Sequence, residues 1–182
     1  MVVQVSTRPG RASDPVAKWA VESARAHGAF DVSFVDLREE ALPLFDEPKH
    51  PRLGQYEHEH TKRWAAKVRA ADAFLFVTPE YNYGMPPSLL NAITFLSTEW
   101  AYKPAAFVSY GGVSAGTRSA QMARGVLTAM KVVAIPEAVS LPFFTKSIEN
   151  GVLVPGDVQD KAAITVLDEL ARWARALATL RS

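Results

Sequence analysis

The chain has 182 residues, a formal net charge of +1 and no cysteine. This length suffices for one domain with a sizeable core. The lack of cysteine excludes disulfides, thiolate catalysis, cysteine-ligated zinc and iron–sulfur clusters, and the near-neutral charge gives no electrostatic footprint for nucleic acid.

The sequence also gives no sign of a membrane or secretory protein. No apolar run approaches the ~20 residues that span a bilayer, and the first residues lack the basic and apolar regions of a signal peptide. We therefore expect one domain over residues 1–182, located in the cytoplasm, with neither a membrane nor a nucleic acid as partner.

Short apolar runs alternate along the chain with segments of helical periodicity. The runs predict five strands, at residues 2–5, 32–36, 73–77, 104–110 and 131–134. Helices are predicted at residues 14–28, 55–70, 89–98 and 117–130, and a last helix contains Ile164 and Leu177. This alternation, with strands that are nearly continuous in apolar residues, favours an α/β fold in which helices cover both faces of a parallel sheet.

Three loops of unusual composition follow strands one, three and four. We call them loop one (residues 6–13), loop two (residues 78–87) and loop three (residues 110–117). In an open parallel sheet, ligands bind outside the carboxyl ends of the strands. The three loops are therefore the candidate site.

Loop one carries hydroxyl groups at Ser6, Thr7 and Ser13 and guanidinium groups at Arg8 and Arg11, and a helix follows it. Hydroxyls, backbone N–H groups and a helix N-terminus suit an anion, and arginine adds bidentate recognition of phosphate. A solvated turn with surface arginines would have the same composition. The loop lacks the Gly-x4-Gly-Lys-Ser/Thr pattern of a Walker A motif.

Loop three contains Gly-x-Ser-x-Gly around Ser114, between a strand and a helix, where a hydrolase nucleophile would lie. The α/β-hydrolase order places the histidine after the serine. All four histidines precede Ser114 in this chain. The better interpretation is a glycine loop whose backbone N–H groups approach a planar ligand.

Two other site types lack a necessary feature. His58 and His60 are expected on one helix, where residues two apart point to different faces, so a shared metal ion is not expected. A receiver domain needs acidic residues at the ends of strands one and three, where this chain has Ser6 and Thr78.

Loop two reads Thr78-Pro-Glu-Tyr-Asn-Tyr-Gly-Met-Pro-Pro87. The tyrosines offer flat amphipathic contact area, and glycine and the prolines fix the backbone. The loop is suited to present a rigid surface to a flat ligand, or to pack against a partner chain. Both roles are compatible.

Residues 79–84, Pro-Glu-Tyr-Asn-Tyr-Gly, followed by Pro-Ser-Leu-Leu-Asn-Ala at 87–92, closely resemble the NAD(P)H-dependent FMN reductase family. That family includes quinone, chromate and azo-dye reductases. The resemblance implies a flavodoxin-like three-layer sandwich with strand order 2-1-3-4-5. It extends over nearly the whole chain, although Val5 stands where the family often has glycine.

The resemblance also implies which residues bind FMN. Ser6, Arg8 and Ser13 would bind the phosphate, and Gly111 and Gly112 would face the pyrimidine edge of the flavin. The residues along the isoalloxazine would be Pro79, Glu80, Tyr81, Asn82 and Tyr83. No side chain is expected to be catalytic, since the flavin carries the chemistry.

The expected activity is transfer of hydride from NADPH or NADH through bound FMN to a small acceptor, such as free flavin, a quinone, an azo dye or a metal oxyanion. The family commonly forms dimers, so we expect a homodimer or a dimer of dimers. An alternative is a flavodoxin-type electron carrier that binds FMN without turning over a substrate. A non-enzymatic partner or regulator is a third hypothesis, and it predicts no flavin binding.

Overall fold

The computed structural model describes residues 1–181 and is built around one five-stranded parallel sheet. The strand order β2-β1-β3-β4-β5 is the predicted one. The strands are β1 (Val2–Gln4), β2 (Phe34–Asp36), β3 (Phe74–Pro79), β4 (Pro104–Gly111) and β5 (Val133–Pro142). The predicted flavodoxin-like architecture is confirmed.

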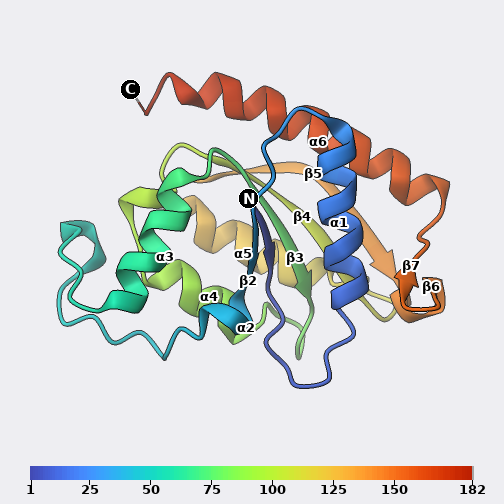
Figure 1. Cartoon of the computed structure of the whole chain (residues 1–182), viewed down its shortest axis with the longest axis horizontal. Coiled ribbons are helices and arrows are strands. Elements are labelled where there is room, and N and C mark those ends of the chain that lie inside the picture. Colours follow the sequence, from blue (N-terminus) through green and yellow to red (C-terminus); the bar gives the residue numbers. More distant parts are fainter. Residues whose placement is uncertain (182) are drawn as a thin grey trace.

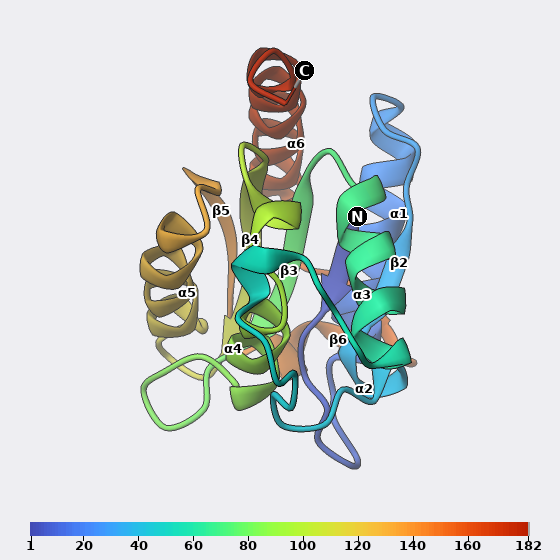
Figure 2. The same cartoon turned by 90° about the vertical axis from the view of Figure 1, so that its left-hand side faces the viewer.

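Helices cover both faces of this sheet, as Figure 1 and Figure 2 show. One face is covered by α1 (Asp14–His27) and α6 (Asp157–Ala178), the other by α3 (Glu59–Ala70), α4 (Pro87–Thr94) and α5 (Thr117–Ala129). The smaller elements are α2 (Leu37–Glu40), the 3₁₀ helices Pro51–Leu53, Thr98–Trp100 and Phe144–Ser147, and the hairpin of β6 (Ile148–Glu149) and β7 (Val152–Leu153). None of the helices in the described residues is long and apolar enough to cross a bilayer.

The alternating side chains of the central strands divide the core into two halves. Phe74, Phe76 and Phe107 pack on the α3–α5 side, where Trp64 and Trp100 are fully buried. Both indole N–H groups donate to carbonyls of α4, at 2.9 Å for Trp64 and 3.2 Å for Trp100. This satisfies the polar atoms that accompany such large buried surfaces.

Several predicted boundaries are wrong. Helix α3 begins at Glu59 rather than near residue 55, because the Glu47 carboxylate accepts the backbone N–H groups of Glu57 and His58. Helix α4 ends at Thr94 instead of residue 98, and a short irregular segment separates it from the 3₁₀ helix Thr98–Trp100.

The strand boundaries and the first helix also differ from the prediction. Strand β2 begins at Phe34 instead of residue 32, and α1 ends at His27, with Gly28 as its C-cap. Strand β5 continues to Pro142, where a short strand with an irregular extension was expected. A register shift between Ala105 and Phe107 accommodates Pro136, which cannot donate a ladder hydrogen bond.

Candidate functional site

The three loops lie together at the carboxyl edge of the sheet, on the lower side of Figure 1. Two hydrogen bonds join them. The hydroxyls of Ser6 in loop one and Tyr81 in loop two are 2.7 Å apart, and Ser114 in loop three donates to the Glu80 carboxylate at 3.1 Å. Loop two therefore contacts both of the others.

Loop one contains a tight turn that exposes Arg8. The Arg11 N–H donates to the Arg8 carbonyl at 3.2 Å, with Pro9 and Gly10 at the centre of the turn and a φ of 64° at Gly10. Proline followed by a residue with positive φ is the signature of a type II turn. Arg8 is exposed, and neither its own N–H nor that of Gly10 has an acceptor in residues 1–181. The turn thus presents unpaired donors at the surface.

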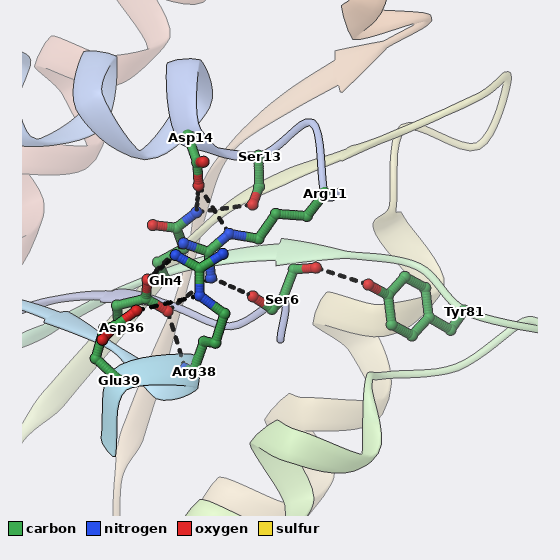
Figure 3. Close-up of polar contacts among 9 residues, drawn as sticks. All are labelled: Gln4, Ser6, Arg11, Ser13, Asp14, Asp36, Arg38, Glu39 and Tyr81. Atoms are coloured by element: carbon green, nitrogen blue, oxygen red, sulfur yellow. Dashed lines mark hydrogen bonds and ion pairs between the residues drawn. The ribbon is translucent and has the colours of Figure 1, made fainter. Parts of the chain in front are cut away.

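Arg11, unlike Arg8, is buried. Its side chain is 4% exposed and lies beneath the loop (Figure 3). It donates to the Ser6 carbonyl at 2.6 Å, to Asp14 at 2.7 Å and to both carboxylate oxygens of Asp36. Burial opposes ionisation of Asp36, but these hydrogen bonds and that from Arg38 N–H outweigh it and lower its pKa. The Arg11 guanidinium therefore supports the loop from inside, and Arg8 remains the arginine predicted to bind the phosphate.

The network also contains Gln4 and Asp36, which are not predicted from the sequence. They are register partners on β1 and β2, and Gln4 donates to Ser13 Oγ and to Asp14, each at 2.7 Å. Their contact depends on strand pairing between distant segments, for which the sequence offers no local signal.

A cluster of buried hydroxyls lies between loops one and two. Ser6 and Ser13 are both buried, and Ser13 Oγ accepts from Gln4 while its own O–H remains available as a donor. The Tyr110 hydroxyl is buried beside these two serines and makes no hydrogen bond of normal geometry within residues 1–181, and its burial raises its pKa. A buried hydroxyl without a partner is costly unless a ligand or water satisfies it. With the free N–H groups of loop one, these donors fit a phosphate group.

A pocket of about 350 Å³ opens beside loop one. Thr7, Leu42, Pro87 and Ser88 contribute to its lining, between α2 and the start of α4. This volume is within the usual range of small-molecule sites.

Loop two contains a strained two-residue turn. Tyr81 and Gly84 exchange both backbone hydrogen bonds, at 3.0 and 2.9 Å, and the φ values of Asn82 and Tyr83 are 48° and 69°. Positive φ at both central residues identifies a type I′ turn, and such backbone strain in residues other than glycine is typical of functional loops. Pro79, by contrast, is buried at the end of β3, opposite Tyr110.

The Glu80 side chain joins loop two to the start of α5. Its carboxylate accepts from Ser114 Oγ, from the Arg118 N–H at 3.2 Å and from the Arg118 guanidinium. Burial opposes its ionisation, but these donors outweigh it and lower the pKa of Glu80. The carboxylate is thus engaged within the protein, and only the backbone of Glu80 is available to a ligand.

Loop three is shaped by its glycines. Gly116 has a φ of 76°, and a Cβ there would lie 2.7 Å from the Tyr110 carbonyl oxygen. A Cβ at Gly111 would lie 3.1 Å from the Gly116 nitrogen, whereas Gly112 is exposed with open space around it. The Ser114 hydroxyl donates to Glu80, which is no arrangement for a nucleophile with a histidine base.

His58 and His60 lie away from the three loops and do not point to different faces, contrary to expectation. Their rings stack with centroids 5.2 Å apart, because His58 precedes α3 as its N-cap. His60 Nε2 lies 3.0 Å from Asp46 Oδ1. No cluster of His, Cys, Asp or Glu among residues 1–181 has the arrangement of a metal site.

Comparisons with known proteins agree with this geometry. Residues 1–146 match the family model for NADPH-dependent FMN reductase. An NAD(P)H-dependent FMN reductase of Schizosaccharomyces pombe is 38% identical over 157 residues, which cover 85% of this chain and 78% of that protein. A 2-hydroxy-1,4-benzoquinone reductase of Burkholderia sp. is 30% identical over 154 residues, covering 80% of each.

Among solved structures, the flavoenzyme NAD(P)H:(acceptor) oxidoreductase FerB of Paracoccus denitrificans shares the fold, with a TM-score of 0.76, 22% identity and 96% coverage of both chains. The family match extends from β1 through β5 and includes all three loops. The chain therefore belongs to the NADPH-dependent FMN reductase family.

Proposed function

We propose that this protein is an FMN-dependent NAD(P)H oxidoreductase. The observation that carries the proposal, in a chain of this family, is a set of donors at loops one and three that have no acceptor among residues 1–181: the Arg8 and Gly10 N–H groups and the Tyr110 hydroxyl. Bound FMN would supply the chemistry, by accepting hydride from a reduced nicotinamide and passing electrons to an acceptor. The protein itself would bind the FMN, orient it and shield it from solvent.

Each of the three loops would bind a different part of FMN. Arg8, the free N–H groups of loop one and the hydroxyls of Ser6 and Ser13 would hold the phosphate. The backbone from Pro79 to Tyr83 would run along the flavin ring. Gly111 and Gly112 would meet its far edge, and the open space at Gly112 supports this close approach.

The acceptor would be a small molecule. The benzoquinone reductase among the relatives supports a quinone, and free flavin, azo dyes and metal oxyanions remain further members of the class. Either NADPH or NADH would be the reductant.

We also propose that residues 1–182 form one domain and that the protein is a homodimer or a dimer of dimers. Exposed leucines support a contact surface on the long segment after β2 and on α4: Leu44 is 84% exposed, Leu53 59% and Leu90 40%. The Trp64 side chain on α3 is fully buried, so it is not available for a contact with a partner chain.

Anaerobic mixing of the FMN-loaded protein with NADPH tests the activity. We expect the yellow absorbance of the flavin to disappear within seconds and to return when a quinone is added. If the flavin stays yellow for many minutes with both NADPH and NADH, the protein is an electron carrier rather than a reductase. Failure to bind added FMN would exclude both.

A further inference from the structure

Tyr83, at the tip of the loop-two turn, packs against the guanidinium of Arg118. The ring is 76% exposed and its backbone has a φ of 69°. In the described part of the chain its hydroxyl makes no hydrogen bond, and its cationic or aromatic contact is the Arg118 guanidinium, whose carbon lies 4.0 Å from the ring centroid. The orientation of this exposed ring therefore depends on Arg118.

Arg118 is itself fixed at two points. Its Nη1 and its backbone N–H both donate to the Glu80 carboxylate, one to each oxygen. That carboxylate is 9% exposed and takes a further hydrogen bond from Ser114. A chain of contacts thus runs from Glu80 in loop two to Arg118 on α5 and back to Tyr83 in loop two.

Only arginine makes both contacts well. The planar guanidinium can bind a carboxylate at its edge while its face lies on an aromatic ring, whereas the ammonium of lysine is a compact point charge. The two tyrosines of the turn also have different neighbours, since Tyr81 bonds to Ser6 on the loop-one side. The Tyr83–Arg118 pair lies on the opposite side of the turn, away from the donors proposed for the FMN phosphate.

We propose that Arg118 is a positioning residue for the reductase reaction, and this rests on the proposed function. It holds the Tyr83 ring as a fixed wall against which the planar group of the second substrate, a nicotinamide or a quinone ring, stacks. The phosphate of FMN is held separately at loop one. Loss of Arg118 thus weakens binding of planar substrates and leaves FMN affinity and the hydride-transfer rate nearly unchanged.

Steady-state kinetics with NADPH and 1,4-benzoquinone test this division. In Arg118→Ala we expect the KM for benzoquinone to rise about two- to fivefold, the range of an exposed cation–π contact, with kcat and the FMN Kd close to wild type. Arg118→Lys should recover part of the loss. Adding Arg118→Ala to Tyr83→Leu should raise KM no further, since the pair acts through one contact.

Hydrogen–deuterium exchange of the apoprotein gives a readout independent of turnover. The Tyr81 and Gly84 amides close the turn, and we expect them to exchange faster in Arg118→Ala. Arg172→Ala is the matched control, because Arg172 is an exposed arginine paired with Glu169 on α6. It should change neither the kinetics nor the exchange of the turn.

The outcomes separate the two proposals. An active wild-type enzyme, with benzoquinone KM and turn exchange unaltered by Arg118→Ala, would overturn the role of Arg118 alone. A KM effect in Arg118→Ala that adds fully to that of Tyr83→Leu would also overturn it. If the wild-type protein binds FMN but never oxidises a nicotinamide, the proposed function fails and the positioning role fails with it.

Discussion

Two arginines three positions apart in loop one have opposite roles. Arg8 is exposed at the start of a turn, whereas Arg11 is buried against Asp36 and the Ser6 carbonyl. Their residue type and spacing do not distinguish them. The difference arises because Pro9 and Gly10 reverse the chain between them, so that the second side chain points back beneath the loop.

This difference predicts the effect of removing Arg8. In Arg8→Ala we expect FMN to bind about ten- to a hundredfold more weakly, the value of a lost hydrogen bond to a charged group. Fluorescence titration of the apoprotein with FMN measures the Kd. Arg63→Ala, on the exposed side of α3, is the control and should bind FMN as wild type does. An unchanged Kd in Arg8→Ala would contradict the assignment of Arg8 to the phosphate.

At the scale of elements, the candidate site is formed by the loops rather than by the helices and strands that they connect. Helix α5 could be recognised from its periodicity, but the conformation of the residues that precede it could not. Gly116 is its N-cap with a φ of 76°, and the space for a side chain is taken by the Tyr110 carbonyl. A glycine loop was predicted, and its particular shape is a result of packing against β4.

Two glycines of this element should respond to alanine in opposite ways. Gly116→Ala should lower the free energy of unfolding by roughly 1–3 kcal/mol, because the left-handed backbone disfavours a Cβ and the carbonyl blocks it. Gly125→Ala, within α5 and with no atom within 4 Å of the added Cβ, should raise it by about 0.5–1 kcal/mol. Urea unfolding measures both. Equal changes in the two variants would show that the Gly116 conformation is not required.

At the scale of the whole molecule, helices cover both faces of the sheet, but the surface around α4 still carries exposed leucines. A large exposed apolar patch commonly marks an interface. This is the surface that we propose as the contact of a homodimer.

The assembly can be tested by placing a charge on that surface. Leu90→Glu should weaken dimerisation by roughly tenfold or more, because an unpaired charge would be buried in an apolar contact. Sedimentation velocity over a range of concentrations measures it. Leu180→Glu changes a leucine that is also exposed, just beyond α6, and should leave the assembly unaltered. A wild-type protein that is monomeric at all concentrations would rule out the proposed dimer.

The sequence by itself determined the fold class, the strand order through the family resemblance, and the position of the three loops. It could do so because apolar strands and amphipathic helices are local patterns, and because loop two is a specific motif. It misplaced element ends where distant side chains intervene, as Glu47 does at the start of α3. Cytoplasmic location stays a prediction.

Only the tertiary structure decided what each polar group of the site contacts. Strand pairing brings Gln4 and Asp36 together beneath loop one, and burial leaves the Tyr110 hydroxyl without a partner in the described part of the chain. The same packing engages the Glu80 carboxylate with Arg118, far along the chain. Hydrogen bonds between segments depend on distance and direction in space, which local sequence patterns do not encode.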